Sequence, residues 1–401
     1  MVWLPDSGGF PLTREQRMDT SRLDDVLQQA VATGAVPNVT AVAADRNGII
    51  YEGAAGPRVV GGAEAVTVDT HYRIMSMTKM VATVAALQQV EKGLLDLGAP
   101  IEQYRPEFAQ LQVLDGFDGT TPRLRPPASK ATVKQLITHT AGLGYWFWND
   151  SLVRWEAATG TPNVLSGSNV IFGAPLLADP GTKLEYGINT DWLGKVVEAA
   201  SGMTLDVAVK DGITGPLGMD NTSFAPSGAE RDDLVPVHLK GADGWAASEI
   251  ELALDPEYYA GGHGLHSTPR DYLKFQRALL GGGELDGTRI LSTATVDAAF
   301  TNQIGELDFP ASIPTADPNS SADFNAGPGH KWGYGLLLNT TDVPGRRRAG
   351  SGAWAGLLNT HFWIDRTAGI TGAVYTQSLP FVVPEVFGVY QDFETSLYAA
   401  L

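Results

Sequence analysis

The stretch YRIMSMTKMVATVAALQQV, residues 72–90, is apolar on all sides but carries one serine and one lysine near its start. The pattern predicts a buried helix over about residues 76–92, ended by Gly93. Residues three apart on a helix share a face, so the amine of Lys79 can reach the hydroxyl of Ser76. A serine needs a base to become a nucleophile, and a lysine in a dry site can act as one. The pattern alone also fits a helix cap with a solvated lysine, since Ser-x-x-Lys is expected about once by chance in a chain of this length.

Composition excludes several classes of function. The 401 residues are 43% hydrophobic and 18% charged, as in a globular protein of two or three lobes. The net charge of −17 disfavours nucleic acid and anionic membranes as partners. With no cysteine, disulfides, thiolate metal sites and cysteine nucleophiles are excluded. No signal peptide or membrane-spanning apolar run is found, so we expect a cytoplasmic protein without membrane contact.

Strand patterns at both chain ends predict one discontinuous domain. A helix is expected over residues 21–34, with Ser21 as its N-cap, followed by a hairpin at Asn47-Gly48. Strands are expected again in residues 331–339, 359–365 and 370–377, and a closing helix over residues 385–400. We therefore expect an α/β (α+β) fold, an antiparallel sheet flanked by helices, built from residues 1–95 and 255–401. Residues 96–254 form an inserted, mainly helical domain, and residues 305–329 a long surface loop.

Two further segments carry groups that suit a serine–lysine pair. Tyr186 lies just before a predicted helix and could pass a proton to a leaving group, although a core tyrosine is the commoner outcome. The small residues from Gly350 to Gly356 enter a strand, where a backbone N–H could approach a reacting carbonyl. A simple bulge or edge strand remains the alternative.

Several blocks in this order resemble the serine β-lactamase and penicillin-binding-protein superfamily. They include YRIMSMTKMVATVAALQQVEKGLLDLGAPI, ATVKQLITHTAGLGYWF, PGTKLEYGINTDWLGKVVE, GPLGMDNTSF and GGHGLHSTPRDYLKF. The likeness is closest to the family VIII carboxylesterases and to the acyltransferase of lovastatin side-chain assembly. It implies that Ser76 is acylated, that Lys79 is its base and that Tyr186 helps protons move. It also implies an oxyanion hole formed by the N–H groups of Ser76 and Leu357.

Departures from the lactamase pattern point to an uncharged ester as substrate. Ile188 stands where Tyr-x-Asn has its amide, and Trp354-Ala355-Gly356 stands where the lactamases have Lys-Thr-Gly. Asn189 or the arginines at 346–348 could compensate, but the arginine run fits a solvated strand entry better. We therefore expect a serine hydrolase of carboxylic esters without metal or organic cofactor. The alternatives are an acyltransferase, a weak β-lactamase or peptidase, and a relative that has lost turnover.

An aromatic patch at YWFWND is the expected wall of the acyl pocket. Tyr145, Trp146 and Trp148, together with Ile188, are candidate substrate contacts, since ligand sites are mostly apolar and aromatic. Packing of the inserted domain explains the same residues equally well. His263 and His266 have no third ligand nearby in the sequence, and a glycine-rich loop explains them more simply than a metal does. The sequence leaves the oligomeric state open.

Overall fold

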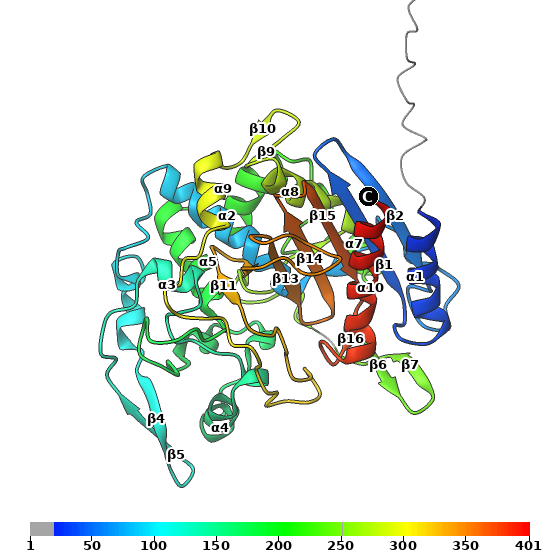
Figure 1. The fold of residues 1–401 in the computed structure, drawn as a ribbon. Helices are drawn as coiled ribbons and strands as arrows, with labels where there is room; N and C mark the ends of the chain where they lie inside the picture. Colours follow the sequence, from blue (N-terminus) through cyan, green and yellow to red (C-terminus); the bar gives the residue numbers. More distant parts are fainter. Residues whose placement is uncertain (1–19, 251) are drawn as a thin grey trace, which may run out of the picture.

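A seven-stranded antiparallel sheet forms the centre of the computed structural model, which describes residues 20–250 and 252–401 (Figure 1). Its strands, in spatial order, are β11 (His330–Trp332), β12 (Leu337–Asn339), β13 (Gly352–Gly356), β14 (Thr360–Asp365), β15 (Ile370–Tyr375), β1 (Val39–Asp45) and β2 (Ile49–Ala55). Asn47 and Gly48 connect β1 to β2, as predicted. The predicted sheet from both ends of the chain is confirmed.

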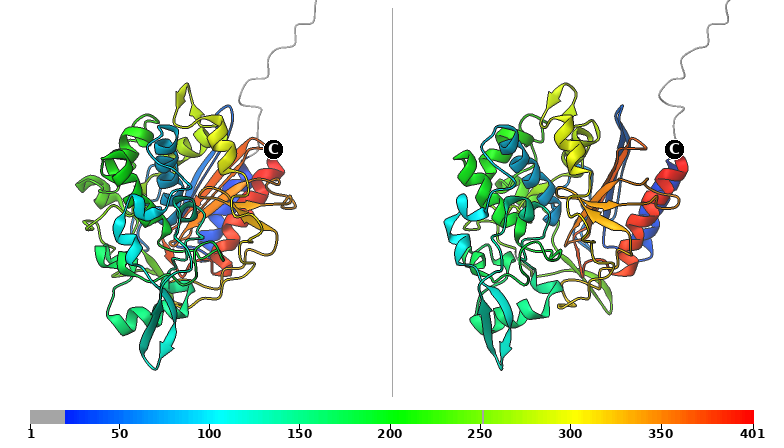
Figure 2. Two further views of the ribbon diagram at one scale, coloured as in Figure 1. Left: turned by 90° about the vertical axis from the view of Figure 1, so that its left-hand side faces the viewer. Right: turned by 60° about the vertical axis from the view of Figure 1, so that its left-hand side comes forward.

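Helices cover both faces of this sheet (Figures 1 and 2). The first and last helices, α1 (Ser21–Ala32) and α10 (Pro384–Ala400), lie together on one face over a core that includes Leu23, Trp363 and Phe393. On the other side lie α8 (Pro269–Leu280), α2 (Thr78–Glu91) and α5 (Asn189–Ser201). The helix α1 begins at Ser21, so its N-cap is Thr20, one residue before the predicted cap Ser21.

The remaining elements are short and mostly lie between the two halves of the sheet in the sequence. The helices are α3 (Val133–Ile137), α4 (Asp150–Thr159), α6 (Leu205–Val209), α7 (Gly228–Asp233) and α9 (Thr293–Ala299). The 3₁₀ turns are η2 (Met75–Met77), η3 (Ile101–Gln103), η4 (Pro106–Gln110), η5 (Trp146–Trp148), η6 (Val164–Ser166) and η7 (Asn169–Gly173), and η8 (Lys210–Thr214) is a π-helical turn. The minor strands are β3 (Tyr72–Arg73), β4 (Val113–Asp118), β5 (Thr121–Arg125), β6 (His238–Gly241), β7 (Gly244–Ala247), β8 (His266–Ser267), β9 (Glu284–Leu285), β10 (Thr288–Arg289) and β16 (Ser378–Leu379). The division at residues 95 and 255 stays a prediction.

The segment 305–329 contains no helix or strand and packs against η5. The backbone N–H of Ala316 donates to the carbonyl of Phe147 at 2.8 Å. The indole N–H groups of Trp146 and Trp148 donate to Asp317 and Ser321, each at 3.1 Å. The aromatic patch is therefore joined to the sheet domain through this loop. Among the described residues, no helix has the length and apolarity to cross a membrane.

Candidate active site

Ser76 sits in a strained turn between a short strand and a buried helix. It belongs to η2, which links β3 to α2, and the preceding Met75 has a φ of +48°. A residue other than glycine holds this left-handed conformation only when its surroundings fix it. Here Ile74 is fixed on both sides, by a bond from its N–H to Leu265 and by a bond from the Thr360 hydroxyl to its carbonyl at 3.1 Å. The turn thus places Ser76 ahead of α2, close to the predicted helix start.

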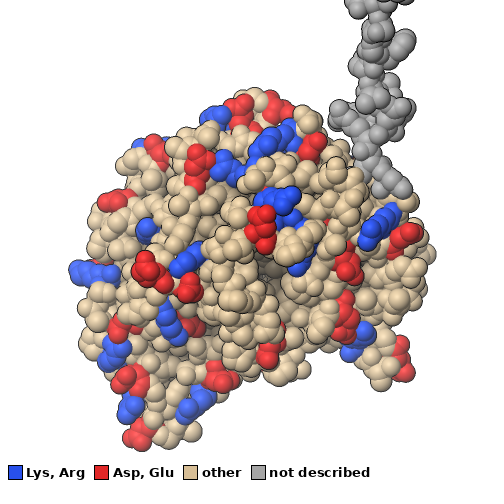
Figure 3. Space-filling view, viewed as in Figure 1, with Lys and Arg blue, Asp and Glu red and all other residues tan. Residues whose placement is uncertain are grey.

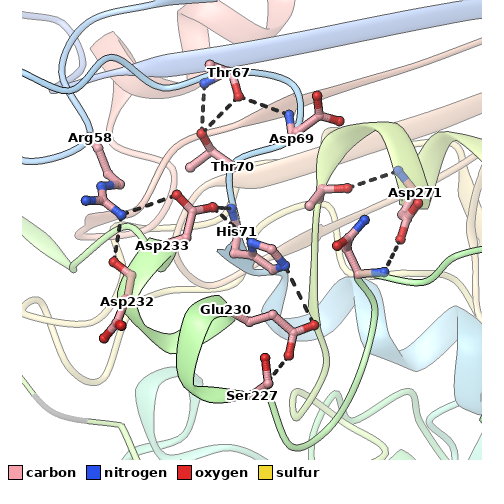
Figure 4. A network of polar contacts seen from close by, with 12 residues as sticks. Arg58, Thr67, Asp69, Thr70, His71, Ser227, Glu230, Asp232, Asp233 and Asp271 are labelled. Atoms are coloured by element: carbon pink, nitrogen blue, oxygen red, sulfur yellow. Dashed lines mark hydrogen bonds and ion pairs between the residues drawn. The ribbon is translucent and has the colours of Figure 1, made fainter.

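A polar network outside the site fixes the strand that leads to this turn (Figure 4). Asp233, at the end of α7, accepts from the backbone N–H of His71 at 3.0 Å and lies 2.9 Å from its Nδ1. Arg58 binds the same aspartate at 3.2 Å. Val235 then donates its N–H to the carbonyl of His71. The residues just before β3 are therefore held by α7 and by the chain that follows it.

Lys79 is the second residue of α2, and its amine is aimed at Ser76. Nζ is 3.0 Å from Ser76 Oγ, and the lysine side chain is only 1% exposed. Its other two hydrogen-bond partners are Tyr145 Oη at 2.9 Å and the carbonyl of Gly262 at 2.7 Å. All three donor positions of the amine are therefore used, and one of them is on the candidate nucleophile.

Asp191 in α5 supplies the negative charge of this buried cluster. Its Oδ1 accepts from the backbone N–H of Gly262 at 3.0 Å, and its Oδ2 accepts from Tyr145 Oη at 3.5 Å. Gly262 thus joins the two ions through its N–H and its carbonyl. A Cβ at this position would lie 2.4 Å from Asp191 Oδ2 and 2.8 Å from Tyr145 Oη, so only glycine fits there.

Burial sets the protonation of both ions. It lowers the pKa of Lys79 to about 7, while the charge of Asp191 acts in the opposite direction. Burial likewise raises the pKa of Asp191, and the charge of Lys79 opposes that shift. A lysine that loses its proton near neutral pH can serve as a general base.

Tyr186 is the third polar residue next to Ser76. Burial raises the pKa of its phenol, while hydrogen bonds with Ser76 and Trp354 act against this shift. Trp354 Nε1 donates to Tyr186 Oη at 2.8 Å, and Lys79 Nζ lies 4.8 Å from the centre of the tyrosine ring. Tyr186 therefore lies together with Ser76 and Lys79, which were predicted from a different segment.

The C-terminal end of β13 lies close to the turn that carries Ser76. Its first residues pair with β12, but Trp354, Ala355 and Gly356 pair only with β14. A Cβ on Gly356 would lie 2.4 Å from the carbonyl of Ile74 and 2.9 Å from the Cβ of Met75. Leu357, the residue expected to complete an oxyanion hole, follows directly, and its role stays a prediction.

Asn189 and the arginine run, the two candidate replacements for the lactamase side chains, form contacts away from Ser76. Asn189 is fully buried, and its Nδ2 is bonded to His139 at 3.0 Å and to the carbonyl of Leu143 at 2.9 Å. Arg347 is buried against Glu394, so the arginine run is not a uniformly solvated strand entry as expected. Ile188 is 4% exposed and lines a small cavity of about 20 Å³ with Tyr145 and Trp146.

Trp148 is a second aromatic residue of the patch, beside Tyr145, that packs against the site. Its ring centre is 5.4 Å from that of Tyr186 and 5.3 Å from that of Phe324 in the loop 305–329. Phe324 in turn contacts the Trp354 ring at 6.1 Å. Aromatic rings therefore close the site on the side of the loop, and their contact with substrate stays a prediction.

A cavity of about 40 Å³ with unpaired nitrogen atoms opens on the other side of Met75. It is lined by Arg73, His263 and His266, among others. Nε of Arg73 and Nδ1 of both histidines are buried without a hydrogen-bond partner within the described part of the chain, although Nδ1 of His263 lies 3.7 Å from Asp191 Oδ1. Buried polar groups normally have partners, so Arg73 Nε and His266 Nδ1 mark a place where a polar ligand group can bind.

Three contributors to the site were not predicted as such. Tyr145 was expected as a pocket wall, but its hydroxyl joins the lysine to Asp191. The only signal for Asp191 was that a lysine in a buried helix needs a partner. Nothing in the sequence indicated that Gly262, far along the chain, connects the two.

Known proteins resemble this chain over most of its length. Residues 23–395 match the family described as Beta-lactamase. A lovastatin esterase of Penicillium rubens is 33% identical over 94% of this chain and 98% of its own length. A monacolin J acid methylbutanoyltransferase of Aspergillus terreus is 30% identical over 94% of this chain and 95% of its own. The solved structure of unliganded simvastatin synthase from Aspergillus terreus has a TM-score of 0.82 at 28% identity, covering 95% of this chain and 98% of that one. The chain therefore belongs to the beta-lactamase family.

Proposed function

We propose that this protein is a serine hydrolase of carboxylic esters that works through an acyl-enzyme on Ser76. The observation that carries the proposal is the 3.0 Å contact between Ser76 Oγ and the amine of a fully buried lysine. Burial lowers the pKa of that amine to about 7, so it can be neutral and accept the serine proton. The names of related esterases and acyltransferases support the same chemistry.

The reaction follows in two balanced steps. Ser76 Oγ attacks the ester carbonyl while its proton passes to Lys79, and the N–H groups of Ser76 and Leu357 hold the oxyanion. The C–O bond to the alcohol breaks as the alcohol takes a proton from Lys79 or Tyr186. Water then attacks the acyl carbonyl and gives a proton to the same pair. The bond between the acyl carbon and Ser76 Oγ breaks as Oγ takes this proton back, which releases the carboxylic acid and restores the enzyme.

A β-lactamase activity is disfavoured because two polar groups of the lactamase pattern are absent, one on β13 and one just before α5. Trp354 cannot supply the charge of a lysine, and Ile188 cannot supply an amide. The amide of Asn189 is held by His139 and backbone carbonyls. We expect a chromogenic cephalosporin to be opened far more slowly than a simple ester.

Transfer to an alcohol is the second candidate, and a specific observation favours it. The rings of Trp148, Phe324 and Trp354 close one side of the site, and exclusion of water from an acyl-enzyme favours another acceptor. The related methylbutanoyltransferase of Aspergillus terreus bears the name of such a reaction. Product analysis with a thioester donor and a panel of alcohols separates new esters from free acid.

Arg73 and the two histidines beside Met75 favour a different substrate from the uncharged ester that the sequence pattern predicts. We expect an ester that carries a carboxylate or another oxygen-rich group able to fill the cavity next to Met75. Arg73→Gln is then expected to raise KM for a dicarboxylic half-ester by at least about tenfold and to leave a neutral ester unchanged.

Intact mass spectrometry after treatment with a fluorophosphonate is the direct test. One adduct is expected on the wild type and none on Ser76→Ala. Ser351→Ala is a control, because Ser351 is buried and bonds to the carbonyl of Arg348, so the adduct should persist in this variant. An adduct that survives in Ser76→Ala would remove Ser76 from the mechanism.

A further inference from the structure

A second, larger cavity lies on the side of the sheet where α10 packs. It has a volume of about 260 Å³, which leaves room for a small organic molecule. Ala353 and Phe387 line it, and both also contact the core under α1 and α10. Trp354, the next residue of β13, also lines it but sends its indole the other way, to Tyr186. Figure 3 shows a hollow near the centre of the face seen in Figure 1, with basic and acidic side chains beside it.

The charges around this cavity are unbalanced. Arg346 and Arg347 line it, and no acidic residue is found among its described lining residues. Arg347 uses both oxygens of the buried Glu394, through Nε and Nη2 at 2.7 Å each. Arg346 reaches the same carboxylate only at 3.7 Å. Two guanidinium groups thus share one carboxylate, which leaves one positive charge in a protein of net charge −17.

A histidine in the wall has an unsatisfied nitrogen. His361 of β14 is 4% exposed, and its Nε2 is buried with no hydrogen-bond partner in the described chain. Its ring is held between Tyr390 and Phe381, nearly parallel to both at centre distances of 4.7 Å and 5.8 Å. A buried polar atom without a partner is costly, so a ligand that bonds to it is favoured.

The rest of the wall is apolar. Phe324, Leu337, Val343 and Phe387 line the cavity between the loop 305–329 and α10. A fully charged ligand such as inorganic phosphate would leave these side chains without a partner, and a pure hydrocarbon would leave Arg346 and His361 without one. The lining therefore matches a molecule with one anionic group and an aliphatic body.

We propose that this cavity is a binding site for a monocarboxylate with an aliphatic chain, separate from Ser76. The carboxylate binds Arg346 and His361, and the chain lies along Phe324 and Phe387. Strand β13 lies between the two sites, and Trp354 and Phe324 belong to the walls of both. The proposal does not depend on the reaction at Ser76.

Binding of octanoate to protein already blocked at Ser76 by a fluorophosphonate is the test. Calorimetry should show saturable binding of octanoate, with octanol and inorganic phosphate at least about tenfold weaker. Arg346→Gln should weaken octanoate binding by about tenfold or more. Arg348→Gln is the matched control, because Arg348 belongs to the same run but pairs with Asp342 and does not line the cavity.

A second variant tests the volume of the site. Ala353→Leu should occupy part of the cavity and reduce octanoate binding, while turnover of p-nitrophenyl butyrate by the unblocked variant shows that the fold is intact. Octanoate binding that is absent from the blocked wild type overturns the proposal. Binding that is unchanged in both Arg346→Gln and Ala353→Leu, or equally weakened in Arg348→Gln, overturns it as well.

Discussion

Replacement of Asp191 by asparagine tests whether the buried carboxylate sets the basicity of Lys79. The amide keeps the shape of the side chain and an oxygen for the N–H of Gly262, but it removes the negative charge. Tyr145 Oη lies 2.9 Å from Lys79 Nζ and 3.5 Å from Asp191 Oδ2, so the two charges are at most about 6.4 Å apart. At an effective dielectric constant of about 20, their attraction is about 2.6 kcal/mol, which corresponds to about two pKa units.

The expected result is a displaced pH profile. Lys79 accepts a proton only when neutral, so kcat/KM rises as the pH increases through its pKa, about 7 in the wild type. Loss of the Asp191 charge lowers this pKa, so the acid limb moves to lower pH by about two units or more. The plateau should also fall, because a weaker base accepts the serine proton less readily.

The assay is kcat/KM for p-nitrophenyl butyrate from about pH 4.5 to about pH 9. Asp271→Asn is the control, since Asp271 is a buried carboxylate in α8 that pairs with Lys274 at 2.8 Å, away from the site. Its profile should keep the wild-type acid limb. An acid limb that stays in place in Asp191→Asn, or moves to higher pH, contradicts the assigned role of the carboxylate.

Three further predictions concern the groups around Ser76. Lys79→Ala and Tyr186→Phe should each lower kcat by about 10²–10⁴, the usual range for lost acid–base help, and wild-type rates in either variant would exclude that residue. Trp354→Phe removes the N–H that bonds to Tyr186 and raises the pKa of the phenol further, so kcat/KM should fall about fivefold, as measured by steady-state kinetics. Gly356→Ala places a Cβ 2.4 Å from the carbonyl of Ile74, so kcat should drop by about 100-fold with an unchanged circular dichroism spectrum. A normal kcat there would show that β13 need not approach the turn.

Local sequence pattern predicted several helices and strands. The motif and the family resemblance predicted three residues of the candidate site. The apolar run after Ser76 indicated a buried helix, and Asn47-Gly48 indicated the hairpin, because both depend on neighbours in the sequence. Ser76, Lys79 and Tyr186 followed from the motif and the family resemblance. The N-cap of α1 was wrong by one residue, since Thr20 and Ser21 are both suitable caps.

Long-range partners could not be predicted in the same way. Asp191 and Gly262 meet Lys79 only because α5 and the loop before β8 pack on α2, and nothing near them in the sequence indicates this. Arg347 looked like a surface residue because arginines usually are, but Glu394 of α10 draws it into the interior. Pairings of this kind are decided by tertiary packing, which a single sequence does not display.

The distribution of charge around Ser76 favours recognition of an acidic substrate at Arg73 rather than on β13. On β13, Trp354 has replaced the lactamase lysine, and its indole is committed to Tyr186. The charge of Lys79 is opposed by that of Asp191, so these two residues beside Ser76 carry almost no net charge together. Arg73 is half-buried on the other side of Met75, and its Nε has no partner among the described residues. We infer that a substrate carboxylate binds on that side of the turn, opposite to the place where a β-lactam carboxylate binds in the lactamase pattern. A half-ester whose KM responds to Arg73→Gln but not to Trp354→Phe would support this orientation, and the reverse response would contradict it.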